Sequence, residues 1–183
     1  MLRSQSEFNN DHFEVLVESY VVNERMFQII LEHLDNAAWR AQIPGIKGRT
    51  IAATVVHVDN MRRKWLRLSA PYLKLSPPLD RARCTQTEAK AALAHSATRC
   101  VEMLTDAFVR RQRRVKTFVR DGWAKPWPSG PSMVAFMISH DAHHRGQICM
   151  LAHQLGYPLP TKTTAGIWVW EQIWKECGFT KPR

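Results

Sequence analysis

Two histidines, His140 and His144, stand four residues apart in a segment whose apolar residues recur at steps of three and four. On a helix such side chains share one face with Cβ atoms about 5 to 6 Å apart, so both imidazoles can reach one ion at about 2.0 to 2.1 Å. His57 is the candidate third ligand, because its neighbours one turn away are small or apolar and let it face another helix. Three histidines with no evident fourth protein ligand predict a divalent-metal site with a position left for water or substrate.

An alternative interpretation treats each histidine as a core residue satisfied by a hydrogen bond, which is the ordinary case for a single buried histidine. The pair at HxxxH spacing shifts the balance toward a metal. Two neutral imidazoles buried side by side each need a partner, and one shared ion satisfies both.

Asp141 follows His140 directly, so the sequence His-Asp-Ala-His-His has the outline of HExxH with Asp in place of Glu. In that motif the acid serves as the general base, which makes Asp141 the candidate catalytic residue. The alternative is a solvated surface carboxylate, since Asp is one methylene shorter than Glu.

Three further residues of this helix are candidates for the layer behind the ligands: His143, Arg145 and Gln147. His143 points about 100° away from His144 around the helix. Gln147 is placed to orient a ligand. Gly146 costs about 1 kcal/mol against Ala in mid-helix, which predicts a close approach of another helix there.

A substrate pocket beside the metal would need large apolar side chains. The candidates are Met61, Trp65, Trp168 and Trp170. The alternative is that these aromatic residues belong to the core, as tryptophan in a helical bundle commonly does.

Helices of some 20 to 30 residues must position these groups, because apolar residues recur at helical steps between breaks rich in Pro and Gly. Regular strand alternation is not found. The predicted helices cover about residues 13–34, 51–68 (capped by Thr50), 85–118 (opened by a Thr85–Glu88 capping box) and 131–155, with a shorter helical segment over 166–177. The pattern predicts an all-α protein, a four-helix bundle forming one domain over residues 1–183, and the long connection before Thr85 leaves room for a crossover.

The sequence of residues 140–147, HDAHHRGQ, resembles the signature on the last bundle helix of the DinB/YfiT-like family. His57, the linker at residues 44–50, the Gly-Tyr-Pro exit at 156–158 and the segment GIWVWE at 166–171 extend the resemblance over most of the chain. It implies a crossover four-helix bundle that forms a homodimer and holds zinc or nickel through His57, His140 and His144. It also implies transfer of a low-molecular-weight thiol, such as bacillithiol, mycothiol or glutathione, or a hydrolase activity.

The composition is that of an ordinary globular protein, with 183 residues, 45% of them hydrophobic, and this excludes a disordered or fibrous chain. The first residues are polar and no uncharged apolar run approaches the ~18 residues of a membrane span, so we expect a cytoplasmic protein without membrane contact. Four widely spaced cysteines without a CxxC pair are expected to be free thiols.

The net charge of +10 favours anionic partners. Basic residues cluster at Arg110–Arg120 and at Arg62–Lys64, either as a phosphate-binding surface or as solvated helix faces that steer an anionic substrate. No DNA-binding motif accompanies them, so nucleic acid is the less favoured partner. We expect a metal-dependent enzyme that acts on a small molecule by thiol transfer or hydrolysis. The alternatives are a metal-binding stress-response protein without turnover and a nucleic-acid-binding protein.

Overall fold

A computed structural model describes residues 5–45, 47–108, 114–119 and 130–179. Over these residues the chain is helical and has no strands, as the sequence predicts. The elements are α1 (Gln5–His33), a short 3-10 helix η1 (Asn36–Ala38), α2 (Ile51–Ser69), α3 (Gln86–Phe108), α4 (Gly130–Gln154), α5 (Thr161–Gly166) and α6 (Trp170–Glu176).

The helix ends follow the chemistry of the residues that flank them. Thr50 caps α2, its Oγ1 accepting a hydrogen bond from the Ala53 amide at 3.1 Å. The predicted capping box opens α3: the Thr85 amide donates to Glu88 Oε2 at 2.8 Å, and the Glu88 amide donates to Thr85 Oγ1 at 3.1 Å. Gly156 follows α4 with a φ of 83°, a left-handed conformation that glycine adopts without strain.

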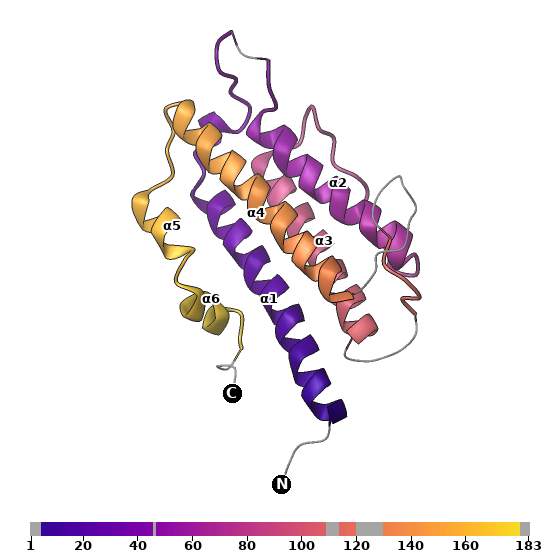
Figure 1. Cartoon of the computed structure of the whole chain (residues 1–183). Coiled ribbons are helices and arrows are strands. Elements are labelled where there is room, and N and C mark those ends of the chain that lie inside the picture. Colours follow the sequence, from indigo (N-terminus) through magenta and orange to yellow (C-terminus); the bar gives the residue numbers. More distant parts are fainter. Residues whose placement is uncertain (1–4, 46, 109–113, 120–129, 180–183) are drawn as a thin grey trace.

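The four long helices form the bundle, and the connection between α2 and α3 is a crossover (Figure 1). The start of α3 lies beside the end of α1, because the Gln86 side chain donates to the carbonyls of Leu31 and Leu34 at 2.8 and 3.1 Å. The chain therefore returns along α2 through residues 70–85 before α3 begins, so α2 and α3 run in the same direction. The short helices α5 and α6 lie beside α1, with their main contacts to it.

The bundle interior holds two apolar clusters with a polar layer between them. On α1 the buried Asn23 lies between Tyr20 of one cluster and Met26 of the other, and on α2 the buried Arg62 lies between Val58 and Trp65. On α4 the buried Asp141 and Arg145 lie between Met137 and Ile148. Polar groups therefore meet at mid-height of the bundle.

Three expected helix ranges differ from the structure, and the first is α1, which begins at Gln5 and not near residue 13. α3 ends at Phe108 among the described residues, and residues 114–119 are not helical. There the Val119 amide donates to Ser69 Oγ at 2.9 Å and the Phe118 ring lies 5.7 Å from that of Phe108, so this segment packs against the end of the bundle. Of the expected helix over 166–177 only α6 (Trp170–Glu176) forms, because Gly166 ends α5 and residues 167–169 form a turn.

Within the described residues, none of the helices has the length and apolar character that crossing a membrane requires. All four cysteines are free thiols, as expected.

Candidate metal centre

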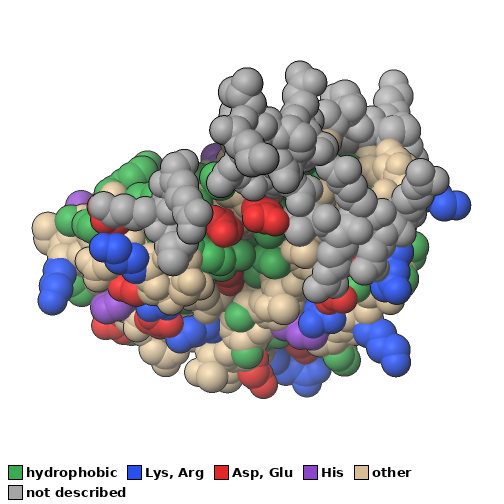
Figure 2. Space-filling model, turned by 90° about the horizontal axis from the view of Figure 1, so that it is seen from below, with side chains coloured by type: hydrophobic (Ala, Val, Ile, Leu, Met, Phe, Trp, Pro, Cys, Tyr) green, Lys and Arg blue, Asp and Glu red, His purple; other side chains and the backbone are tan. Residues whose placement is uncertain are grey.

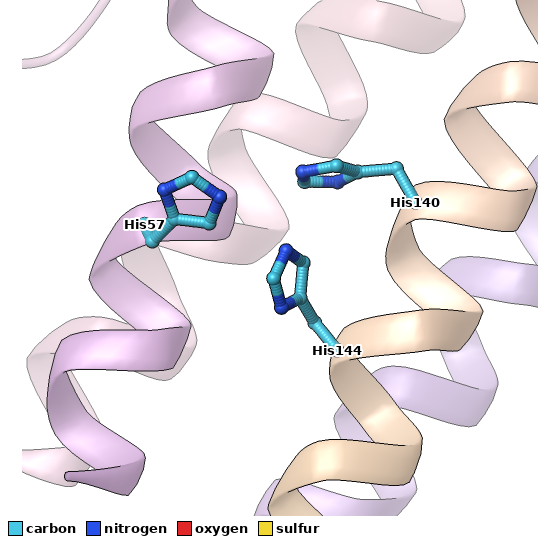
Figure 3. Close-up of side chains that lie close together, drawn as sticks. All are labelled: His57, His140 and His144. Atoms are coloured by element: carbon cyan, nitrogen blue, oxygen red, sulfur yellow. The ribbon is translucent and has the colours of Figure 1, made fainter. Parts of the chain in front are cut away.

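The three histidines predicted as ligands converge between α2 and α4 (Figure 3). Each offers a ring nitrogen, and these three nitrogens all lie within 4.8 Å of one another. The ring centroids are 4.5 Å apart for His140 and His144, 4.8 Å for His57 and His144, and 5.6 Å for His57 and His140. The HxxxH spacing brings the rings of His140 and His144 to one face of α4. The packing of α2 against α4 brings the His57 ring to the same place.

Gln147 determines which nitrogen of His144 is available. His144 Nδ1 lies 2.7 Å from Gln147 Oε1, one turn further along α4. An amide oxygen only accepts hydrogen bonds, so Nδ1 carries the proton and Nε2 presents a lone pair. Gln147, predicted to orient a ligand, is thus in contact with one of the candidate ligands.

The surroundings of His57 and His144 favour neutral rings. Burial, together with the neighbouring His144 and Arg49, lowers the pKa of His57 to about 4. Burial also lowers the pKa of His144. Neutral imidazoles at pH 7 have lone pairs ready to bind a cation.

Asp141, predicted as a general base, lies in the polar layer and is 0% exposed. Its Oδ2 accepts hydrogen bonds from Arg62 Nη2 at 2.6 Å and Asn23 Nδ2 at 3.0 Å. Burial alone would raise the pKa of Asp141, but the Arg62 guanidinium lowers it below its ordinary value. A carboxylate this enclosed cannot reach a substrate proton, so the structure contradicts both the general-base role and the surface-charge alternative.

Arg62 itself is 0% exposed, and both of its terminal nitrogens have acceptors. Besides Asp141 it binds Glu24 Oε2 at 2.7 Å and the Leu93 carbonyl at 3.1 Å. The prediction that Arg62 belongs to an exposed basic surface is wrong. Its charge is used inside the bundle, where a buried cation needs anionic partners.

The other two candidates behind the ligands differ in position. The exposed His143 lies with its ring centroid 5.0 Å from that of His144, in an edge-to-face contact. The buried Arg145 points away from the histidines and donates to the backbone carbonyl of Asn23 at 3.1 Å and to the Asn23 side chain. Gly146 is exposed, and a Cβ placed there would meet no atom within 4 Å, so the expected close helix approach at this glycine is wrong.

The four candidate pocket residues do not come together. Trp65 is fully buried, with its ring centroid 5.2 Å from that of His140, and Met61 on the same helix is half-buried. Trp168 is 77% exposed, and Trp170 on α6 has its ring contact with Trp174 at 6.2 Å. In the described part of the chain neither contacts the three histidines, because α5 and α6 pack mainly against α1.

An open pocket that the sequence did not predict lies at Gln147, and no histidine lines it. Its volume is about 350 Å³. It is lined by Arg49, Thr54, Gln147, Met150, Leu151 and Gln154. Gln147 links it to the site because the same side chain binds His144. Arg49 is the one charged residue in this lining, and no pattern in the sequence marks it.

Only part of the expected basic surface, Arg110–Arg120 and Arg62–Lys64, lies within the described residues. Residues 109–113 and 120 lie outside the described residues, and Arg63, like Arg62, is buried. Arg114 packs its guanidinium 5.5 Å from the centroid of the Tyr72 ring. On the face seen in Figure 2, the described Lys and Arg side chains are scattered among acidic ones and form no single patch.

Fold and site together define an all-helical bundle with a three-histidine cluster between its second and fourth helices. The family model named DinB family matches residues 4–175, most of the chain. This chain belongs to the DinB family, as the HDAHHRGQ resemblance implied. Searches of curated proteins and of solved structures gave no match.

Proposed function

We propose that this DinB-family protein is a metal-dependent enzyme that acts on a small molecule. The single observation that carries the proposal is the convergence of ring nitrogens from His57, His140 and His144 within 4.8 Å. Side chains from two separate helices meet there, which neither core packing nor helix periodicity alone requires.

The donor set fits a divalent cation such as zinc or nickel, for which neutral imidazole is a preferred ligand. Nitrogens that share one ion lie at most about 4.2 Å apart, so the three rings would close slightly around it. Gln147 holds His144 in the tautomer that such binding needs.

When bound, a divalent cation supplies Lewis acidity, which lowers the pKa of water or of a thiol and makes either one a nucleophile at neutral pH. The two reaction classes we propose, thiol S-transfer and hydrolysis, differ in which nucleophile is used. A low-molecular-weight thiol is the co-substrate in the first class.

The open pocket at Gln147, whose side chain contacts His144, is the proposed substrate site. Its volume of about 350 Å³ suits a small molecule. Thr54, Gln147 and Gln154 offer polar groups to a ligand, and Arg49 adds a positive charge, while no acidic residue lines it. This lining favours a substrate with an anionic group such as a carboxylate.

The proposal is tested by metal analysis of the purified protein and of the His57→Ala, His140→Ala and His143→Ala variants. Stoichiometric metal in the wild type, lost in the first two variants and kept in the third, is the expected result. His143→Ala is the matched control because it removes an exposed histidine of the same helix. Equal metal content in all four proteins would exclude the three-histidine site.

Turnover is then measured with thiols and electrophilic substrates, and with ester and amide substrates in the absence of thiol. An enzyme is supported if activity is absent in His57→Ala. It is supported further if removing the metal from the wild type abolishes activity and adding metal restores it. A protein that binds metal stoichiometrically and turns over neither substrate class would instead be a metal-binding protein without catalysis.

A further inference from the structure

Asp141 Oδ1 is the oxygen of this carboxylate that the Arg62 and Asn23 side chains leave without a hydrogen bond. It lies 3.5 Å from Nδ1 of His140, which is long for a hydrogen bond. Both atoms are buried, and within the described residues neither has a hydrogen-bond partner. The two atoms are therefore close to each other, and no hydrogen bond draws either of them elsewhere.

The rest of the network holds the carboxylate in this orientation. Arg62 Nη2 at 2.6 Å and Asn23 Nδ2 at 3.0 Å both donate to Oδ2, which turns Oδ1 toward His140. Asn23 is in turn held by Arg145. The Asp141 side chain is thus tied to α1 and α2 as well as to its own helix.

The His140 ring also lies close to two aromatic residues. Its centroid lies 5.2 Å from that of Trp65, at an interplanar angle of 78°, and 6.3 Å from that of Phe136. Of its two nitrogens, Nδ1 faces Asp141, so Nε2 is left for the cluster with His57 and His144.

We propose that Asp141, held by Arg62 and Asn23, is a positioning residue that keeps the His140 proton on Nδ1 and so reserves Nε2 for a metal ion. A carboxylate without a proton only accepts hydrogen bonds, so it pairs with the Nδ1–H tautomer and opposes the other one. The inference rests on the proposed metal site and assigns to the buried polar layer a function beyond folding.

The substitution Asp141→Asn reverses this preference without changing the size of the side chain. Arg62 and Asn23 both donate toward the position of Oδ2, so the amide oxygen must take that position. The amide NH2 group then faces Nδ1 of His140 and favours the tautomer with its proton on Nε2.

Glu24→Gln is the matched control. Glu24 is the other carboxylate on Arg62, at 2.7 Å, and its replacement removes the same charge from the same guanidinium without touching His140. Cobalt(II) is the probe, measured by chelator competition and by its visible spectrum. We expect a 10- to 100-fold loss of affinity and an altered spectrum in Asp141→Asn, and less than a threefold change in Glu24→Gln.

The metal-free protein gives a second readout. Two-bond ¹H–¹⁵N spectra of histidine-labelled protein, with His140 assigned through His140→Gln, report the tautomer directly. We expect the Nδ1–H form in the wild type and in Glu24→Gln. A wild-type His140 protonated on Nε2, or equal losses of cobalt affinity in the two variants, would overturn the inference.

These results separate the inference from the proposed function. A wild type that binds no cobalt while His140 is in the Nδ1–H form contradicts the metal-dependent enzyme and leaves the positioning by Asp141 supported. If Asp141→Asn does not fold, the tautomer of His140 in the wild type still tests the inference.

Discussion

Nδ1 of His144 and Oε1 of Gln147 lie 2.7 Å apart across one turn of α4. This hydrogen bond selects the His144 tautomer from within the same helix. His140 faces a different partner, the buried carboxylate of Asp141, which is tied to two other helices. Two candidate ligands four residues apart thus have different hydrogen-bonding environments.

Gln147→Leu should weaken metal binding about 10-fold, because His144 loses the acceptor that keeps its proton on Nδ1. Gln147→Glu keeps an acceptor at the same place and should bind metal at least as tightly as the wild type. Chelator competition with zinc measures both. Wild-type affinity in Gln147→Leu would show that the hydrogen bond has no part in binding.

Acid should destabilise the metal-free protein as the pH falls from 6.5 toward 4. The pKa of His57 is lowered from 6.5 to about 4, so in this window the unfolded chain takes up a proton that the folded protein resists. Stability is therefore full above pH 6.5 and decreases below it. The midpoint of urea denaturation at pH 7.5, 5.5 and 4.5 measures the loss, which should be smaller in His57→Gln. An identical loss in that variant would assign the effect to other groups.

Gly146→Ala should stabilise the protein by about 0.5 to 1 kcal/mol, because the glycine lies in the interior of α4, is exposed, and has open space where a Cβ would stand. The melting temperature should rise by a few degrees with metal binding unchanged. Gly130→Ala is the contrasting variant, since its Cβ would overlap the Phe108 ring. Destabilisation by Gly146→Ala would mean that a partner covers this face of α4.

Cys100 should resist alkylation in the folded protein. Burial raises the pKa of this thiol to about 12, and Arg62 and Tyr20 only partly offset the effect. The thiolate is the reactive form, so iodoacetamide at pH 8 should modify Cys100 only after urea unfolds the chain. Peptide mass spectrometry locates the modified residues. Rapid labelling of Cys100 in native buffer would contradict its burial.

Arg49→Ala should remove a preference for anionic ligands in the cavity. With the cobalt-loaded protein, 3-mercaptopropionate should bind more tightly than 2-mercaptoethanol, observed as a thiolate charge-transfer band. The preference should fall about fivefold in Arg49→Ala, as expected for an exposed ion pair of about 1 kcal/mol. Arg49→Lys keeps the charge and should keep the preference. Equal binding of the two thiols to the wild type would exclude an anionic substrate group at Arg49.

The sequence alone determined the features that depend on local periodicity. Steps of three and four predict the four long helices, the Thr85–Glu88 box predicts the start of α3, and HxxxH spacing predicts that His140 and His144 share a face. His57 could be predicted as the third ligand because the residues one helical turn away from it are small or apolar, which is typical of a helix face that packs against another helix. The family followed from the same segment.

Only the tertiary structure decided how charged residues are paired between helices. Arg62 and Asp141 are 79 residues apart, and nothing in either local pattern marks them as buried partners. A charged residue on a helix is ordinarily solvated, and it enters the interior only where another helix brings an opposite charge within reach. That meeting depends on the rotation and direction of whole helices, which the crossover between α2 and α3 sets. The same long-range packing placed Trp168 and Trp170 away from the histidines and formed the cavity beside Arg49.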